Sequence, residues 1–260
     1  MIIITTAYYN KTRVKELLKC LELNSKLSCI EKIIYFLERA PNDDNFYAKI
    51  IKNPKIDLQI INHRPMVKEM IEYANKKYKD RVCILTNSDI YYTDSLLRLK
   101  RVDFSKCNIA LTRYNILAHT MATSGDSYPG FIVEYNGIKL KTMWDNGLSA
   151  DSWIFKLPLN MEKMDMEFPL GTLQCDGYIH TQLLKDKPLF NPVHTIMSIH
   201  LHELWHHSSY NNMKHSSRTF WKETYRQNQS RIAFCKLEDC PLKKKRVREK
   251  KKKQPNDSNN

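Results

Sequence analysis

Residues 81–89 read Arg-Val-Cys-Ile-Leu-Thr-Asn-Ser-Asp, so a carboxylate follows a short apolar segment almost directly. The apolar residues 82–86 predict a buried strand. In open α/β sheets, ligands bind at the carboxyl ends of the strands. We therefore predict that Asp89, with Asn87 and Ser88 beside it, faces a site for a hard divalent cation and a phosphate. The alternative is that Asn-Ser-Asp forms an ordinary turn before the next helix.

Strands and helices alternate through the first half of the chain. The spacing of the apolar residues distinguishes the two kinds of element. Alternation of this kind indicates βαβ units, and hence an α/β fold with a mostly parallel central sheet and helices on both faces. The predicted strands are residues 2–4, 30–37, 56–61, 82–86 and 108–112, and the predicted helices are residues 13–23, 46–51, 66–78 and one that begins at Thr93.

The second half of the chain is less regular. Clusters of Gly, Ser, Asp and Asn in residues 124–150 predict a loop. A short strand at 151–155, a helix from 175 to 184 and a late strand at 195–201 are predicted after it. All six glycines lie after residue 124, which excludes a Gly-x-Gly-x-x-Gly fingerprint or a Walker-type loop at the first βα turns. A nucleotide bound to this sheet needs another means of holding its phosphates, and a metal on a strand-end carboxylate supplies one.

The composition bounds the class of protein. The chain has 260 residues, 42% of them hydrophobic and 27% charged, which is typical of a soluble protein with one large domain. It has no apolar run of the roughly 18 residues that span a membrane and no signal-peptide pattern, so we expect a cytoplasmic protein. Seven scattered cysteines favour a reducing compartment. The abundance of Lys, Asn, Ile and Tyr is compatible with an AT-rich genome, such as that of a large virus acting in a host cell.

The net charge of +14 is concentrated near the C-terminus. Residues 243–253 hold nine Lys or Arg and one Glu, and so carry +8 of that charge. Residues 241–260 have almost no hydrophobic content, which predicts disorder. The predicted organisation is one domain over residues 1–238 and a disordered Lys/Arg-rich tail over residues 239–260. The tail is interpreted either as a nuclear import signal or contact with nucleic acid or an anionic surface, or as a solubilising segment.

Acidic residues stand at the ends of three predicted elements, and two histidines lie at the end of the last strand. The acids are Asp89, Asp151 and Asp176, and the histidines are His200 and His202. Residues two apart in a strand point to the same face, so both histidines can enter one cleft. A carboxylate with an imidazole suits Mn²⁺ or Mg²⁺, and a separate carboxylate suits a general base. The alternative interpretation is structural, with Asp176 as a helix N-cap and Asp151 as a turn cap.

Several of these segments together resemble a known family. They are residues 3–9 (Ile-Ile-Thr-Thr-Ala-Tyr-Tyr), 13, 16–24, 64–65, 73–75, 86–90 (Thr-Asn-Ser-Asp-Ile), 110–114 (Ala-Leu-Thr-Arg-Tyr), 149–155 (Ser-Ala-Asp-Ser-Trp-Ile-Phe), 168–171 (Phe-Pro-Leu-Gly), 175–176, 191–192 and 200–202. In this order they resemble glycosyltransferases of the GT-A type, especially uncharacterised members from bacteria, plants and large DNA viruses. The resemblance covers roughly residues 1 to 202.

The resemblance implies a single GT-A-like domain that moves a sugar from a nucleotide-sugar donor to a hydroxyl of a glycan, protein or small-molecule acceptor. It implies a Mn²⁺ or Mg²⁺ cofactor. Asn87-Ser88-Asp89 resembles the family's Asp-x-Asp motif, in which the last acid binds the metal. Asn87 stands in place of the first acid, and the missing charge is expected to weaken metal binding or to give more of it to a histidine.

The resemblance also implies roles for individual residues. The implied metal ligands are Asp89, His200 and His202. The implied general base is Asp176, with Asp151 as the rival for that role. The residues implied to bind the donor are Thr6, Tyr8, Arg13, Arg64, Asn87, Ser88 and Arg113.

Other interpretations stay open from the sequence alone. His202-Glu203-Leu204-Trp205-His206 matches the zinc-peptidase pattern His-Glu-x-x-His, with Glu203 as the base and Glu223 as a third ligand. The basic tail and the 10% aromatic content suit a non-catalytic nucleic-acid-binding protein. A folded but inactive transferase is a further alternative, because Asn87 replaces an acid.

Overall fold

The computed structural model describes residues 1–8, 13–38, 52–117, 130–142, 147, 149–172, 175–201 and 229–244. Its main element is a seven-stranded sheet in the order β11-β6-β10-β4-β1-β2-β3. The strands are β1 (Ile2–Tyr8), β2 (Lys32–Glu38), β3 (Ile56–Ile61), β4 (Val82–Thr86), β6 (Asn108–Leu111), β10 (Ser152–Lys156) and β11 (Leu189–Phe190). All neighbours pair in parallel except β10, which is antiparallel to both β4 and β6. The predicted mostly parallel α/β sheet is therefore confirmed.

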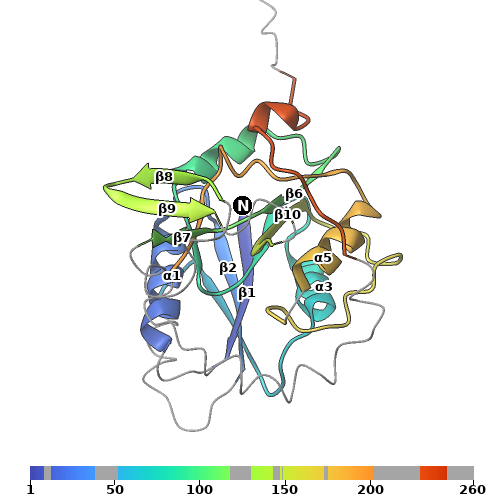
Figure 1. Cartoon of the computed structure of the whole chain (residues 1–260). Coiled ribbons are helices and arrows are strands. Elements are labelled where there is room, and N and C mark those ends of the chain that lie inside the picture. Colours follow the sequence, from blue (N-terminus) through green and yellow to red (C-terminus); the bar gives the residue numbers. More distant parts are fainter. Residues whose placement is uncertain are drawn as a thin grey trace, which may run out of the picture.

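Helices cover both faces of this sheet, as predicted. The helices are α1 (Val14–Lys26), α3 (Val67–Lys77) and α5 (Cys175–Leu184), together with the 3-10 helices η1 (Asp94–Arg101) and η3 (Leu237–Asp239). Buried residues of α1 and η1 join one core cluster, and those of α3 and α5 join the cluster on the opposite face (Figure 1). Strands buried on both faces read as continuous apolar runs, as Ile2, Ile3 and Ile4 do in β1. No helix within the described ranges is both long and apolar enough to cross a membrane.

A second sheet of five strands has the order β5-β12-β7-β9-β8. Its strands are β5 (Ile90–Tyr92), β7 (Tyr114–Ile116), β8 (Ile132–Tyr135), β9 (Ile138–Thr142) and β12 (Ser198–His200). The sequence assigns residues 124–150 to a loop, but the structure forms the β8–β9 hairpin within them. Asn136 and Gly137 join the two strands with φ values of 51° and 76°, and an Asn-Gly pair is the residue choice that such a tight hairpin turn favours.

Most other predicted elements differ from the structure only at their ends. The strands predicted at 56–61 and 82–86 match β3 and β4. The helix predicted from Thr93 is the 3-10 helix η1, and Thr93 caps it by accepting a hydrogen bond from the Ser95 N–H. The late strand is shorter than predicted, because β12 contains only Ser198–His200. The predicted helix at 46–51 lies outside the described residues.

The C-terminal strap, residues 229–244, runs across the domain and hydrogen-bonds to several of its elements. The Ser230 N–H donates to the Gly177 carbonyl of α5 at 3.0 Å. A Cβ at Gly177 would lie 2.9 Å from the Cβ of Gln229, so the close approach of the strap requires glycine there. Further along, the Lys243 N–H donates to the Arg101 carbonyl at 2.9 Å. Residues 241–243, which the sequence assigns to the tail, therefore pair with the domain, and residues 245–260 lie outside the described part of the chain.

Asn24 joins α1 to the edge strand β5, which begins one residue after Asp89. Its buried side-chain amide donates to the Ile90 carbonyl at 2.8 Å and accepts from the Tyr92 N–H at 3.1 Å. Asn24 therefore takes the place of a neighbouring strand along this edge. The helix fixes the position of the strand that follows Asp89.

Replacing Asn24 by Ala is expected to lower the free energy of unfolding by about 2–4 kcal/mol, because two buried backbone groups lose their partners. Urea unfolding followed by circular dichroism measures the change. Lys15→Ala, at an exposed position of the same helix, is the control and is expected to stay close to wild type. Equal stability of the two variants would contradict the role given to Asn24.

Candidate active site

Polar residues that adjoin three strands of the large sheet lie together where those strands end or begin. β4 and β6 end there at Thr86 and Leu111, and antiparallel β10 begins there, with Ser152 paired to both of them. The residue after β4 is Asn87, and Asp151 immediately precedes β10. The Asn87 N–H donates to the Asp151 carbonyl at 3.1 Å, which ties the two segments together. The carboxyl ends of two parallel strands and the start of an antiparallel one thus define the site.

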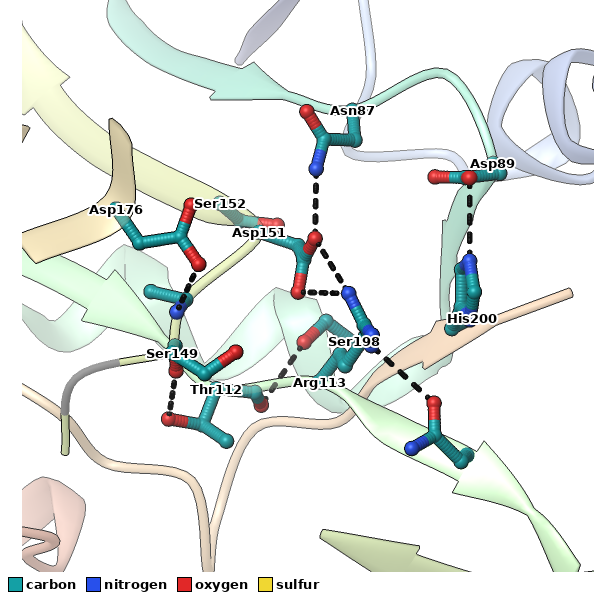
Figure 2. Close-up of polar contacts among 12 residues, drawn as sticks. Asn87, Asp89, Thr112, Arg113, Ser149, Asp151, Ser152, Asp176, Ser198 and His200 are labelled. Carbon is teal, nitrogen blue, oxygen red and sulfur yellow. Dashed lines mark hydrogen bonds and ion pairs between the residues drawn. The ribbon is translucent and has the colours of Figure 1, made fainter. Parts of the chain in front are cut away.

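Asp89 and His200 come together although 111 residues separate them. The cause is the antiparallel pairing of β12 with β5, which sets His200 opposite Ile90. The Nε2 atom of His200 lies 3.1 Å from Oδ2 of Asp89 (Figure 2). A guanidinium nitrogen of Arg13 donates to the same Oδ2 at 2.8 Å. The structure therefore brings together an acid, an imidazole and an arginine that the sequence singled out.

The surroundings of Asp89 keep its carboxyl ionised. Burial opposes ionisation, but the charges and hydrogen bonds of His200 and Arg13 outweigh it and hold the pKa of Asp89 well below its ordinary value. The other oxygen, Oδ1, is buried and has no hydrogen-bond partner among the described residues. A buried anionic oxygen without a donor is a group that a bound cation can satisfy.

Glu16 supports this arrangement and was not singled out by the sequence. Its carboxylate accepts from Nε of Arg13 at 3.0 Å and is only 2% exposed. Glu16 thus holds the guanidinium that contacts Asp89. A charged pair three residues apart at the start of a helix is also common on exposed surfaces, so the sequence signal was available but not distinctive.

Asp151 is held by two side chains and does not face the site unpaired. Nη1 of Arg113 donates to both of its oxygens, at 2.8 and 2.9 Å. The side-chain amide of Asn87 donates to Oδ1 at 2.6 Å (Figure 2). Asp151 is buried, with 2% exposure. A buried carboxylate that accepts three hydrogen bonds from charged or amide donors is a counter-ion and an anchor.

Arg113 interacts with all three acids that the sequence singled out. Burial lowers the pKa of its guanidinium, but the charges of Asp151, Asp89 and Asp176 raise it, and the net direction is upward. Its Nε donates to Oδ1 of Asn115 at 3.2 Å. No described residue accepts a hydrogen bond from its Nη2. The guanidinium is therefore fixed along one side and has donor capacity left for a ligand.

Asp176 lies at the start of α5, in a different electrostatic environment. Its Oδ2 accepts from the Ala150 N–H at 3.3 Å, and its Oδ1 accepts from the Cys175 thiol at 3.3 Å. Burial and then the charge of Asp151 raise the pKa of Asp176 to about 7. Figure 2 draws Asp176 on one side of the Asp151–Arg113 pair and Asp89 with His200 on the other. Two acids of one site therefore have pKa values displaced in opposite directions, a pattern typical of enzymes that need both an anion and a proton acceptor.

The remaining residues singled out by the sequence have varied positions. Arg64 donates to the Leu170 carbonyl at 3.0 Å. A Cβ built on Gly171, where φ is 74°, would lie 3.7 Å from Oδ1 of Asn87 and 4.0 Å from Nη2 of Arg64, so both side chains border this loop. Thr6 in β1 and Ser88 in the turn before β5 are partly exposed.

Three of the sequence hypotheses fall wholly or partly outside the described residues. Tyr8 ends β1, but its side chain is not among the described groups. His202 lies outside them, as does the whole His-Glu-x-x-His segment 202–206. The structure therefore gives no geometry for a zinc-peptidase site.

The residues present fit a divalent cation whose shell a phosphate completes. Among the described residues, no group of three or more His, Cys, Asp or Glu side chains is arranged around a common metal position. Asp89 and His200 nevertheless offer a carboxylate beside an imidazole, and within the described part of the chain Oδ1 of Asp89 has no hydrogen-bond partner. Mg²⁺ in such sites commonly uses one or two carboxylates together with substrate phosphates.

Comparison with known proteins gives a likeness of fold. No protein-family model matches the sequence, and no curated protein sequence matches it. The Staphylococcus aureus TarS 1–349 structure in complex with UDP-GlcNAc has a TM-score of 0.51 and 13% sequence identity, and the match covers 80% of this chain and 60% of that one. The mannosyltransferase PcManGT from Pyrobaculum calidifontis, in complex with GDP-Man and Mn²⁺, has a TM-score of 0.45, 10% identity and coverage of 76% and 55%.

The chain therefore has a GT-A-like fold, as the sequence predicted. It spans about 60% of the length of the matched TarS structure. At these identities the likeness concerns the arrangement of the elements, and the roles of individual residues rest on the geometry of this site.

Asn87→Asp gives residues 87–89 the spacing Asp-x-Asp but sets a second carboxylate against Asp151. Like charges raise the pKa of at least one of two adjacent carboxyls, so the folded variant retains a proton that the unfolded chain releases. Its loss of stability is therefore expected to grow between about pH 5 and about pH 8, as urea unfolding measures. Asn115→Asp, which sets the new charge against Nε of Arg113, is the matched control and should show no such growth. A deficit of Asn87→Asp that does not change with pH would refute the repulsion.

Proposed function

We propose that this protein is a glycosyltransferase that moves a sugar from a nucleotide-sugar donor to an acceptor hydroxyl. The observation that carries the proposal is a pair of acids with opposite pKa displacements, Asp89 and Asp176, on either side of one arginine at the strand ends of a GT-A-like sheet. TarS, whose structure contains UDP-GlcNAc, has this fold, which supports a nucleotide-sugar donor here.

The donor side of the site needs positive charge where the leaving group forms. When the bond to the anomeric carbon breaks, negative charge grows on the oxygens of the departing nucleoside diphosphate. Arg113 offers its Nη2 to such an oxygen, while Asp151 and Asn115 fix the rest of its guanidinium. Arg13 and Arg64 add cations at the borders of the site. Fixed charges of this kind need no reorganisation during the reaction.

A divalent cation fits the same side of the site. We propose that Asp89 and His200 bind it, with His202 as a further ligand, and that Mn²⁺ or Mg²⁺ there would stabilise the charge of the diphosphate as a Lewis acid. Arg13 and Glu16 orient the Asp89 carboxylate for this role. Thr6, Tyr8, Asn87 and Ser88 are proposed donor contacts, because they lie at or directly beyond the carboxyl ends of β1 and β4.

The acceptor side of the site needs a base. We assign this role to Asp176, since its raised pKa of about 7 lets it take a proton from an acceptor hydroxyl near neutral pH. Asp151, the rival for the role, has both oxygens engaged by Arg113 and one of them also by Asn87. Removing a proton with Asp151 would require breaking these bonds. Asp151 therefore positions the arginine, and Asp176 accepts the proton.

Asp89→Asn is expected to abolish turnover with little loss of folding, because it removes the anionic ligand of the cation. The assay is release of nucleoside diphosphate from a panel of nucleotide sugars in the presence of Mn²⁺, with and without a chelator. Asp80→Asn, at an exposed acid on a turn, is the control for the loss of one carboxylate. Two results would count against the metal assignment: full activity in Asp89→Asn, or wild-type turnover that the chelator does not change.

Asp176→Asn is expected to lower turnover by about 10²–10⁴-fold while leaving donor affinity near wild type, because a base acts on the acceptor. Calorimetric titration with the nucleoside diphosphate measures the affinity. The wild-type rate should rise with pH through about 7, as Asp176 loses its proton, and this limb should vanish in Asp176→Asn. Loss of donor affinity in the variant would instead make Asp176 a donor ligand.

A further inference from the structure

Cys175 has an unusual hydrogen-bond partner. All seven cysteines are free, and among the described residues Cys175 is the one whose thiol donates to a carboxylate, at 3.3 Å from Oδ1 of Asp176. Its side chain is buried, with 2% exposure, so water does not compete for the thiol. The backbone holds the pair in place, because the Cys175 N–H donates to the Thr172 carbonyl at 3.1 Å at the start of α5.

We propose that Cys175 is a positioning residue that orients the Asp176 carboxylate and sets its basicity through the Sγ–H···Oδ1 hydrogen bond. The inference deepens the proposed function, since it rests on Asp176 being the base. Each carboxylate oxygen of Asp176 accepts one hydrogen bond from these partners, the thiol on Oδ1 and the Ala150 N–H on Oδ2. Two donors on two oxygens fix the plane of the carboxylate.

The choice of a thiol has a physical consequence. Hydrogen bonds donated to a carboxylate favour its charged form, and strong donors can lower its pKa far below neutrality. A thiol is a weak donor, so it can fix the orientation of the carboxylate while leaving it basic. Burial keeps the thiol protonated, because it raises the pKa of Cys175 well above its ordinary value, as the charge of Asp176 also does. Cys175 therefore remains a donor across the range in which Asp176 titrates.

Other charges also face Asp176 and must stay constant in a test. The charge of Asp151 raises the pKa of Asp176, and the Arg113 guanidinium lowers it. Both belong to elements other than α5: Asp151 precedes β10, and Arg113 lies between β6 and β7. A substitution at Cys175 leaves these two groups in place. The strength of the donor on Oδ1 is then the quantity that changes.

The test compares Cys175→Ala, which removes the donor, with Cys175→Ser, which replaces it with a stronger one. The pKa of Asp176 is expected to rise in Cys175→Ala and to fall in Cys175→Ser, each by about half a unit or more. Titration of ¹³C-carboxyl-labelled aspartate by NMR measures it, and Asp176→Asn assigns the signal. Cys83→Ala, a buried cysteine of the same core cluster, is the control for a lost thiol and should leave this pKa unchanged.

The NMR titration does not depend on activity, so it separates this inference from the proposed function. A pKa that is the same in wild type, Cys175→Ala and Cys175→Ser would overturn the role of Cys175. If the pKa values follow the expected order, the pH at the midpoint of the rise in transfer rate should shift in the same order. If the NMR order holds but the rate profile does not move, Cys175 tunes Asp176 and the assignment of Asp176 as the base fails.

Discussion

The ion pair between Arg113 and Asp151 is the interaction on which the candidate site depends. Three acids approach one another at the edge of the sheet, and buried carboxylates repel strongly unless a cation lies among them. Arg113 supplies that cation, with two hydrogen bonds to Asp151 at 2.8 and 2.9 Å. The other two acids take different states around this pair. His200 and Arg13 keep Asp89 ionised, whereas burial and the charge of Asp151 raise the pKa of Asp176 despite the opposing charge of Arg113.

A second chain of contacts links distant parts of the sequence to Asp89. Glu16 holds Arg13, Arg13 holds Asp89, and Asp89 contacts His200. Two of these residues belong to the first turn of α1 or its N-cap, one to the turn before β5 and one to β12. Asn24, further along α1, fixes β5 through two backbone hydrogen bonds. The same helix therefore positions both the side chain and the backbone of the Asp89 turn, which couples the stability of α1 to the geometry of the site.

The sequence predicted the large sheet well and the small sheet poorly, for a physical reason. Strands such as β4 are buried on both faces, so their apolar runs are visible locally. Strands β5 and β12 have three residues each, too few for a periodic pattern, and their pairing depends on residues far apart in the chain. The β8–β9 hairpin did carry a local signal, Asn136-Gly137, which the surrounding polar residues obscured.

The candidate site likewise contains some residues that could be recognised from the sequence and others that could not. Asp89 was recognisable because it follows a visible strand. His200 was singled out with it, but the contact between the two side chains depends on the pairing of β12 with β5. Glu16 and Cys175 were not singled out as site residues, because a glutamate in a helix and a scattered cysteine are common everywhere. Their roles depend on burial and on a partner that only the folded chain supplies.

The amide at residue 87 follows from the same balance of charge. The Asn87 side chain donates to Asp151 at 2.6 Å. An amide can donate this bond, whereas an ionised carboxylate can only accept. The Arg113 guanidinium is shared among Asp151, Asp89 and Asp176, so a second anion at residue 87 would lie against the Asp151 carboxylate. An asparagine therefore keeps Asp151 satisfied without adding a second negative charge beside it.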